Sequence, residues 1–98
     1  MELATDCKNL TEVRNCIDEL DREIIKLIGK RYAYVKRAAD FKTDEQAVRA
    51  PERFKNMLQK RRDWATEESL NPTVIAKLYT DLVNYFIEEE LTTWKQEK

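Results

Sequence analysis

Three cations share one row of an amphipathic pattern. Arg14, Arg31 and Lys42 fall in register with apolar residues at alternating steps of three and four, as on one face of a helix. The full row is Arg14, Ile17, Asp21, Ile24, Ile28, Arg31, Val35, Ala38 and Lys42. Each cation alone could extend to solvent at the edge of the stripe. Together they favour an anion site, filled either by protein carboxylates or by a small dicarboxylate that arginine forks bind in bidentate geometry.

Glu90 and Arg53 are further candidates for this site. Glu90 lies four residues after Phe86 and three after Ile87, hence on the apolar face of the last helical pattern. It could form an internal ion pair with one of the cations, or contact a bound ligand. Residues 43–50 follow Lys42 directly and precede Arg53. This polar segment is either a plain connection or a lid over the site.

Composition narrows the chemistry and the fold class. The 98 residues include no histidine, which excludes histidine triads, histidine acid–base catalysis and zinc sites with histidine ligands. Because 18 basic and 19 acidic side chains nearly cancel, we expect neither a nucleic-acid partner nor a membrane partner. One glycine, two prolines and 38% charged residues against 42% apolar are typical of an all-helical protein.

Periodicity and helix-breaking residues predict one domain of three helices over residues 1–98. The first helix is expected over about 9–42, a loop over 43–50, the second helix over about 51–67 and the third over about 72–95. Pro51 and Pro72 suit the first position of a helix, and Asn71 suits the N-cap.

The helix lengths predict a homodimer. A first helix of roughly 33 residues would be about 50 Å long, whereas the other two would be about 24 Å and 36 Å, too short to cover it. An antiparallel pair of long helices, with a twofold axis near residues 21–23, would cover the remaining apolar surface. Arg14 and Arg31 lie about 25 Å apart on one helix and would meet across such a dimer, with Lys42 two to three turns beyond. Two sites would then form, each from both chains.

The cysteines and the start of the chain indicate a soluble cytoplasmic protein. Cys7 and Cys16 are too few for a disulfide framework. Residues 1–8 contain no apolar region of the kind found in signal peptides, and no later apolar run is long enough to span a membrane.

Taken together, these residues resemble the all-helical class of chorismate mutases over about residues 6–94. The resemblance is carried by Leu10-x-x-Val13-Arg14-x-x-Ile17-Asp18-x-Leu20-Asp21, by Lys30-Arg31, by Val35 to Lys42, and by Arg53 just after Pro51. Within that class the chain is most similar to the isochorismate pyruvate lyases of salicylate and siderophore synthesis. This second likeness is carried by Asp6-Cys7, Tyr34-Val35-Lys36, Phe41-Lys42, Ala50-Pro51-Glu52-Arg53 and Trp64-Ala65.

The resemblance implies the chorismate mutase type II fold, an intertwined homodimer of three-helix chains with shared active sites. It implies that Arg14 of one chain and Arg31 of the other hold the two carboxylates of the substrate. Lys42 would contact the breaking ether on a mobile loop, and Arg53 and Glu90 would complete the site. The implied reactions are pericyclic, either isochorismate to salicylate and pyruvate or chorismate to prephenate, and they require no metal or cofactor.

Two positions depart from the family pattern. Typical bacterial mutases carry an acidic residue where this sequence has Ala50, which favours the lyase. Glutamine is usual at position 90, where it donates a hydrogen bond to the ether oxygen, but a carboxylate can only accept. Glu90 must therefore be protonated to do the same, so we expect an acid-shifted pH optimum that Glu90→Gln would move upward.

The expected function is that of an isochorismate pyruvate lyase with secondary chorismate mutase activity. One alternative is a chorismate mutase proper. A further alternative is a non-catalytic helical dimer, whose buried cations pair internally with Glu90 and Asp21.

Overall fold

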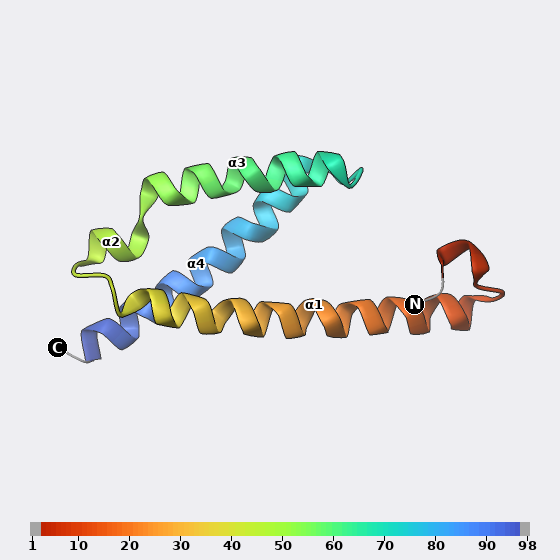
Figure 1. Cartoon of the computed structure of the whole chain (residues 1–98), viewed down its shortest axis with the longest axis horizontal. Helices are drawn as coiled ribbons and strands as arrows, with labels where there is room; N and C mark the ends of the chain where they lie inside the picture. Colours follow the sequence, from red (N-terminus) through yellow and green to blue (C-terminus); the bar gives the residue numbers. More distant parts are fainter. Residues whose placement is uncertain (1–2, 97–98) are drawn as a thin grey trace. The chain divides into compact units, whose positions relative to one another are not determined.

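The computed structural model describes residues 3–96, and within this range every regular element is a helix (Figure 1). The elements are a 3₁₀ turn η1 (Ala4–Asp6), α1 (Leu10–Ala39), α2 (Glu45–Arg49), α3 (Pro51–Glu67) and α4 (Pro72–Gln96). The side chains of Gln46 and of residues 93–96, including the expected apolar Trp94, lie outside the described part. The all-helical class predicted from composition is confirmed.

Polar caps close the start of α1. The Asn9 Oδ1 accepts a hydrogen bond from the Glu12 backbone N–H at 2.9 Å, and the Glu12 carboxylate accepts one from the Lys8 N–H at 2.6 Å. Side-chain acceptors at this position satisfy N–H groups that have no partner within the helix. The local sequence is thus sufficient to begin the helix.

The first helix ends three residues earlier than expected. Beyond Ala39, the backbone N–H groups of Asp40 and Lys42 bond to carbonyls three residues back, as in a tighter 3₁₀-type turn. The Asp40 carboxylate also pairs with Arg37 at 2.8 Å. Lys42 therefore lies on a turn after the helix and not in the helix itself.

Residues 43–50, expected to be a loop, contain the short helix α2. The Asp44 Oδ1 accepts a hydrogen bond from the Ala47 N–H at 2.7 Å and caps its start. Glu45 in its first turn and Arg49 in its last turn pair at 3.4 Å, and both charges complement the helix dipole. These local interactions explain why the segment is helical.

The buried centre of this part of the chain joins α2 to α4. Val48 of α2 packs with Ile87 and Leu91 of α4, and all three are buried. The half-buried Phe54 and Val83 pack around them. Burial of Val48 fixes α2 on α4 because an apolar side chain gains about 1.5–3 kcal/mol when it leaves water.

Helices α3 and α4 form a hairpin joined by a Schellman turn (Figure 1). The Leu70 N–H bonds to the Ala65 carbonyl at 2.7 Å, and the Ser69 N–H bonds to the Thr66 carbonyl at 3.1 Å. Ser69 adopts the left-handed conformation, with φ 61°, where glycine is usual. The serine therefore leaves some conformational strain at this turn.

Helices α3 and α4 begin at the two prolines of the chain. Pro51 follows Ala50, which has a positive φ of 40°. Pro72 follows Asn71, whose Oδ1 accepts hydrogen bonds from the N–H groups of Thr73 and Val74 at 2.9 and 3.1 Å. Proline at the first helical position fixes the backbone without losing a helical hydrogen bond.

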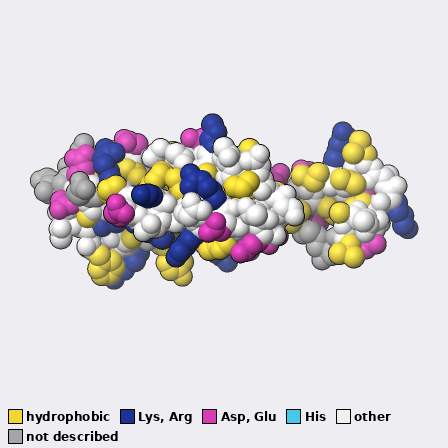
Figure 2. Space-filling view, turned by 90° about the horizontal axis from the view of Figure 1, so that it is seen from above, with side chains coloured by type: hydrophobic (Ala, Val, Ile, Leu, Met, Phe, Trp, Pro, Cys, Tyr) yellow, Lys and Arg dark blue, Asp and Glu magenta, His cyan; other side chains and the backbone are white. Residues whose placement is uncertain are grey.

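The chain divides after Tyr34 into two compact units. In the first unit the apolar stripe of α1 is uncovered, and no residue of this helix is buried. Its exposed apolar side chains include Leu10, Val13, Ile17, Leu20, Ile24 and Leu27. Figure 2 shows apolar side chains reaching the surface between charged ones on the face it presents. Within residues 3–96, none of the helices has the length and apolar character needed to cross a membrane.

Candidate active site

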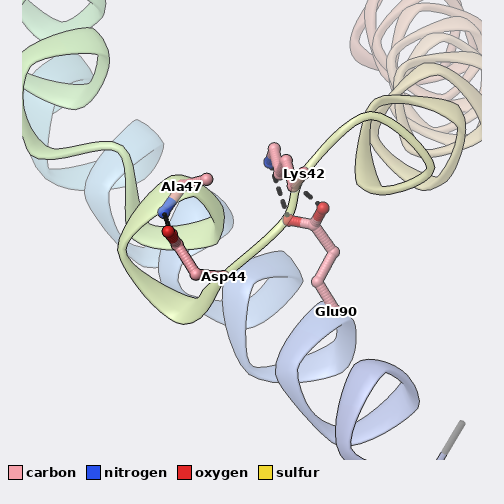
Figure 3. A network of polar contacts seen from close by, with 4 residues as sticks. All are labelled: Lys42, Asp44, Ala47 and Glu90. Atoms are coloured by element: carbon pink, nitrogen blue, oxygen red, sulfur yellow. Dashed lines mark hydrogen bonds and ion pairs between the residues drawn. The ribbon is translucent and has the colours of Figure 1, made fainter. Parts of the chain in front are cut away.

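An ion pair joins two of the predicted site residues (Figure 3). The Lys42 Nζ donates to the Glu90 Oε1 at 3.1 Å and lies 3.5 Å from Oε2. The Glu90 side chain is 4% exposed and that of Lys42 is 23% exposed. A carboxylate this deeply buried requires a partner, because an unpaired desolvated charge is strongly unfavourable.

This ion pair differs in kind from the others among the described residues. The pairs of Arg37 with Asp40, of Arg49 with Glu45 and of Lys77 with Asp81 each lie within one turn of the chain and are exposed. Exposed pairs of this type contribute about 0–1 kcal/mol. The contact of Lys42 with Glu90 instead joins residues 48 positions apart and is mostly shielded from water.

The connection between α1 and α2 positions Lys42. Figure 3 shows this lysine reaching α4 from the connection, close to the turn where Asp44 bonds to Ala47. Because Val48 packs on α4, the end of the connection that enters α2 is held against α4. The ammonium group is thereby presented to a defined point on α4.

The apolar face of α4 positions Glu90. Phe86, Ile87 and Leu91 are buried beside it, as the helical spacing predicts. The neighbouring Glu88 and Glu89 are exposed. Among the described residues, Glu90 is the one charged residue that is buried. Its predicted place on the apolar face of the helix is confirmed.

The expected internal ion pair of Glu90 is present, and its partner is Lys42. In this arrangement the lysine ammonium is neutralised by a protein carboxylate. The alternative role of Glu90, direct contact with a ligand, stays a prediction.

The three arginines occupy separate places on the helices. Arg14 is exposed and Arg31 half-buried, both on α1, while Arg53 is exposed in the first turn of α3. Arg14 and Arg31 are separated by about 25 Å along the axis at the standard helical rise. A single α1 therefore cannot present both to one small dicarboxylate.

The contribution of α2 to the site was missed by the sequence analysis. Val48, which anchors the segment beside Lys42 and Glu90, is a single large aliphatic residue between Phe41 and Phe54 and gives no periodicity. The available sequence signals were Asp44 as an N-cap and the spacing of Glu45 and Arg49. Together these indicate one helical turn, although they do not show what it packs against.

Comparison with known proteins identifies the family. Residues 13–91 match the family chorismate mutase type II, and this range includes all five predicted site residues. The chain therefore belongs to the chorismate mutase type II family, a family of enzymes. The range matched by the family, residues 13–91, includes parts of both units of the chain.

Two relatives are similar over most of their length. An isochorismate pyruvate lyase of Pseudomonas aeruginosa is 36% identical over 96 residues, which cover 98% of this chain and 95% of the relative. A chorismate mutase of Methanocaldococcus jannaschii is 29% identical over 79 residues, 80% of each chain. Both relatives are named as enzymes, in agreement with the enzymatic function expected from the sequence.

Proposed function

We propose that this protein is an isochorismate pyruvate lyase with secondary chorismate mutase activity. The observation that carries the proposal is the 36% identity to an isochorismate pyruvate lyase across 98% of the chain. The substrate would be a small dicarboxylate with an enolpyruvyl ether. Elimination of pyruvate with transfer of a hydrogen would leave salicylate, and no group on the protein needs to act as a nucleophile.

We also propose that the working form is a homodimer with two shared sites. The uncovered apolar side chains of α1, among them Ile17 and Ile24, support this assembly. So does the separation of Arg14 and Arg31, since a partner helix running the opposite way would bring an Arg14 to each Arg31. Within such a dimer the two units of each chain would belong to one domain.

The proposed residue roles follow from charge and position. Arg14 from the partner chain and Arg31 would hold the two carboxylates of the substrate in bidentate contacts. Lys42 and Glu90 would contact the ether as its bond breaks, with Arg53 completing the site. Catalysis would come from holding a flexible dianion in a reactive conformation and stabilising the charge that develops on the ether oxygen.

A second candidate function is that of a chorismate mutase proper, which converts chorismate to prephenate. The family itself and the 29% identical relative favour it. The two candidates share residues and charge, so substrate turnover must separate them. A non-catalytic helical dimer with internal pairing of Lys42 and Glu90 predicts turnover of neither substrate.

The test is to mix the purified protein with isochorismate and, separately, with chorismate at pH 5 and pH 7.5, and to quantify salicylate, pyruvate and prephenate. Salicylate with equimolar pyruvate, formed faster than prephenate, supports the lyase. Prephenate as the main product supports the mutase. Lys42→Ala should lose turnover while Lys55→Ala, an exposed lysine of α3, retains it. Absence of product from both substrates would overturn both enzymatic proposals.

The proposed reaction needs one enzyme that supplies its substrate and another that consumes its product. An enzyme that isomerises chorismate to isochorismate must supply the substrate, and an enzyme that uses salicylate, as in siderophore synthesis, would consume the product. We place this chemistry in the cytoplasm. Because the chain contains no histidine, the site would work without proton transfer by an imidazole.

A further inference from the structure

Two side chains of the segment between α1 and α3 meet the same stretch of α4. The Lys42 Nζ lies 3.1 Å from the Glu90 carboxylate, and Val48 packs with Ile87 and Leu91 (Figure 3). Ile87 lies three residues before Glu90 and Leu91 directly after it. Because residues three and four apart are neighbours on a helix surface, the apolar contact and the ion pair lie beside each other.

We propose that Val48 is a positioning residue for Lys42, and that the packing of its side chain on α4 determines turnover although it acts only through the lysine. This inference rests on the proposed function, in which Lys42 contacts the ether of the substrate. It adds an apolar residue to a site that is otherwise described by its charges.

The short helix α2 cannot hold its own shape. It has five residues, whereas isolated helices shorter than about 12–15 residues are marginal in water. Its local contacts, the hydrogen bond of Asp44 with Ala47 and the ion pair of Glu45 with Arg49, are exposed. Exposed contacts of this kind contribute little. The helix therefore depends on burial against α4.

Val48 provides that burial. Its side chain is buried, Ala47 is half-buried, and Glu45 and Arg49 are exposed, so Val48 is the buried residue among the described side chains of α2. Val48→Ala would remove the two methyl groups of this contact and leave a void beside α4. The attachment of α2 to α4 would be weakened at this point.

Lys42 is tied closely to the place of α2. Only Thr43 and Asp44 separate it from the helix, and two residues span at most about 7 Å. A displacement of α2 would therefore be transmitted to the lysine. The ammonium is carried on a flexible four-carbon stem, so its ion pair does not by itself define where the group lies. A shift of about 1 Å in a reacting geometry can lower a rate by about 10²-fold.

The experiment combines trace acetylation of lysines by acetic anhydride, quantified by mass spectrometry, with the kinetics of isochorismate and chorismate turnover. In Val48→Ala we expect Lys42 to be acetylated severalfold faster than in the wild type, with Lys55, an exposed lysine of α3, unchanged as the internal control. We expect kcat per folded chain to fall at least about tenfold with KM within about twofold, because the proposed arginine contacts to the carboxylates remain.

Three further variants test whether the apolar contact itself is responsible. Val48→Ile keeps the branched side chain and should keep kcat within about threefold of the wild type. Val48→Thr keeps the shape but places a hydroxyl in the contact, so its kcat and its labelling of Lys42 should lie between those of the wild type and Val48→Ala. Ile75→Ala, at a half-buried position of α4 about 18 Å along the axis from Ile87, should lower stability without changing kcat per folded chain.

Several results would overturn the inference. Wild-type labelling of Lys42 in Val48→Ala would do so, whatever happens to turnover, and so would a wild-type kcat. Equal falls in kcat in Val48→Ile and Val48→Ala would exclude the apolar contact as the cause, and an equal fall in Ile75→Ala would attribute the loss to stability alone. If Val48→Ala does not fold, Val48→Thr decides, and wild-type labelling and turnover in that variant would overturn the inference.

The proposed function fails in a different way. If the wild type turns over neither substrate, the proposed function is overturned. Faster acetylation of Lys42 in Val48→Ala would then still support the control of the lysine by Val48, because labelling needs no substrate.

Discussion

Removing Lys42 should destabilise the fold far more than neutralising Glu90, because the two side chains are unequally buried. The Glu90 side chain is 4% exposed, and that of Lys42 is 23% exposed. In Lys42→Ala the carboxylate remains buried without its cation, and breaking a buried pair in this way costs about 3–5 kcal/mol. In Glu90→Gln the flexible lysine can extend its ammonium to solvent, so we expect a loss of about 1 kcal/mol.

The assay is urea unfolding followed by circular dichroism at a fixed chain concentration, since dimerisation makes apparent stability depend on concentration. The double variant Lys42→Ala/Glu90→Gln should recover about 2 kcal/mol relative to Lys42→Ala, and Lys55→Ala should stay within about 0.5 kcal/mol of the wild type.

Two results would refute this reasoning. Equal losses in the Lys42→Ala and Glu90→Gln single variants would mean that unequal burial has no energetic consequence. Strictly additive losses in the double variant would mean that the two side chains do not interact in solution, despite the 3.1 Å contact. In the second case the contact would contribute nothing to the stability of the fold.

Four further outcomes are expected. Asn71→Ala removes the cap of α4 and should cost about 1 kcal/mol in urea unfolding; an unchanged midpoint would contradict it. Ser69→Gly relieves the left-handed backbone at the end of α3 and should raise stability by about 1 kcal/mol, seen as a higher Tm. Ile24→Lys, at an exposed apolar position of α1, should yield monomers by light scattering, whereas a persistent dimer would place the interface elsewhere. Glu90→Gln should shift the pH optimum of turnover upward, and a wild-type profile rising steadily to pH 8 would contradict this.

The local sequence was sufficient for the helical class and for several helix ends. The start of α4 follows from Asn71 and Pro72, because an N-cap and a fixed φ act within a few residues. The burial of Glu90 on α4 likewise follows from helical periodicity, since residues three and four apart share a face. The same periodicity placed Arg14 and Arg31 on the first helix, whereas Lys42 lies beyond the end of α1.

Only the tertiary structure decided which groups meet. Val48 carries no periodic signal, yet its packing on Ile87 holds α2 against α4. Lys42 leaves the helix expected to contain it, because the chain tightens into a turn after Ala39, and from there it reaches Glu90. This contact joins residues 48 positions apart. Short-range preferences act over a few residues of the chain, whereas a pair so distant in sequence is selected by burial of the surfaces that carry it.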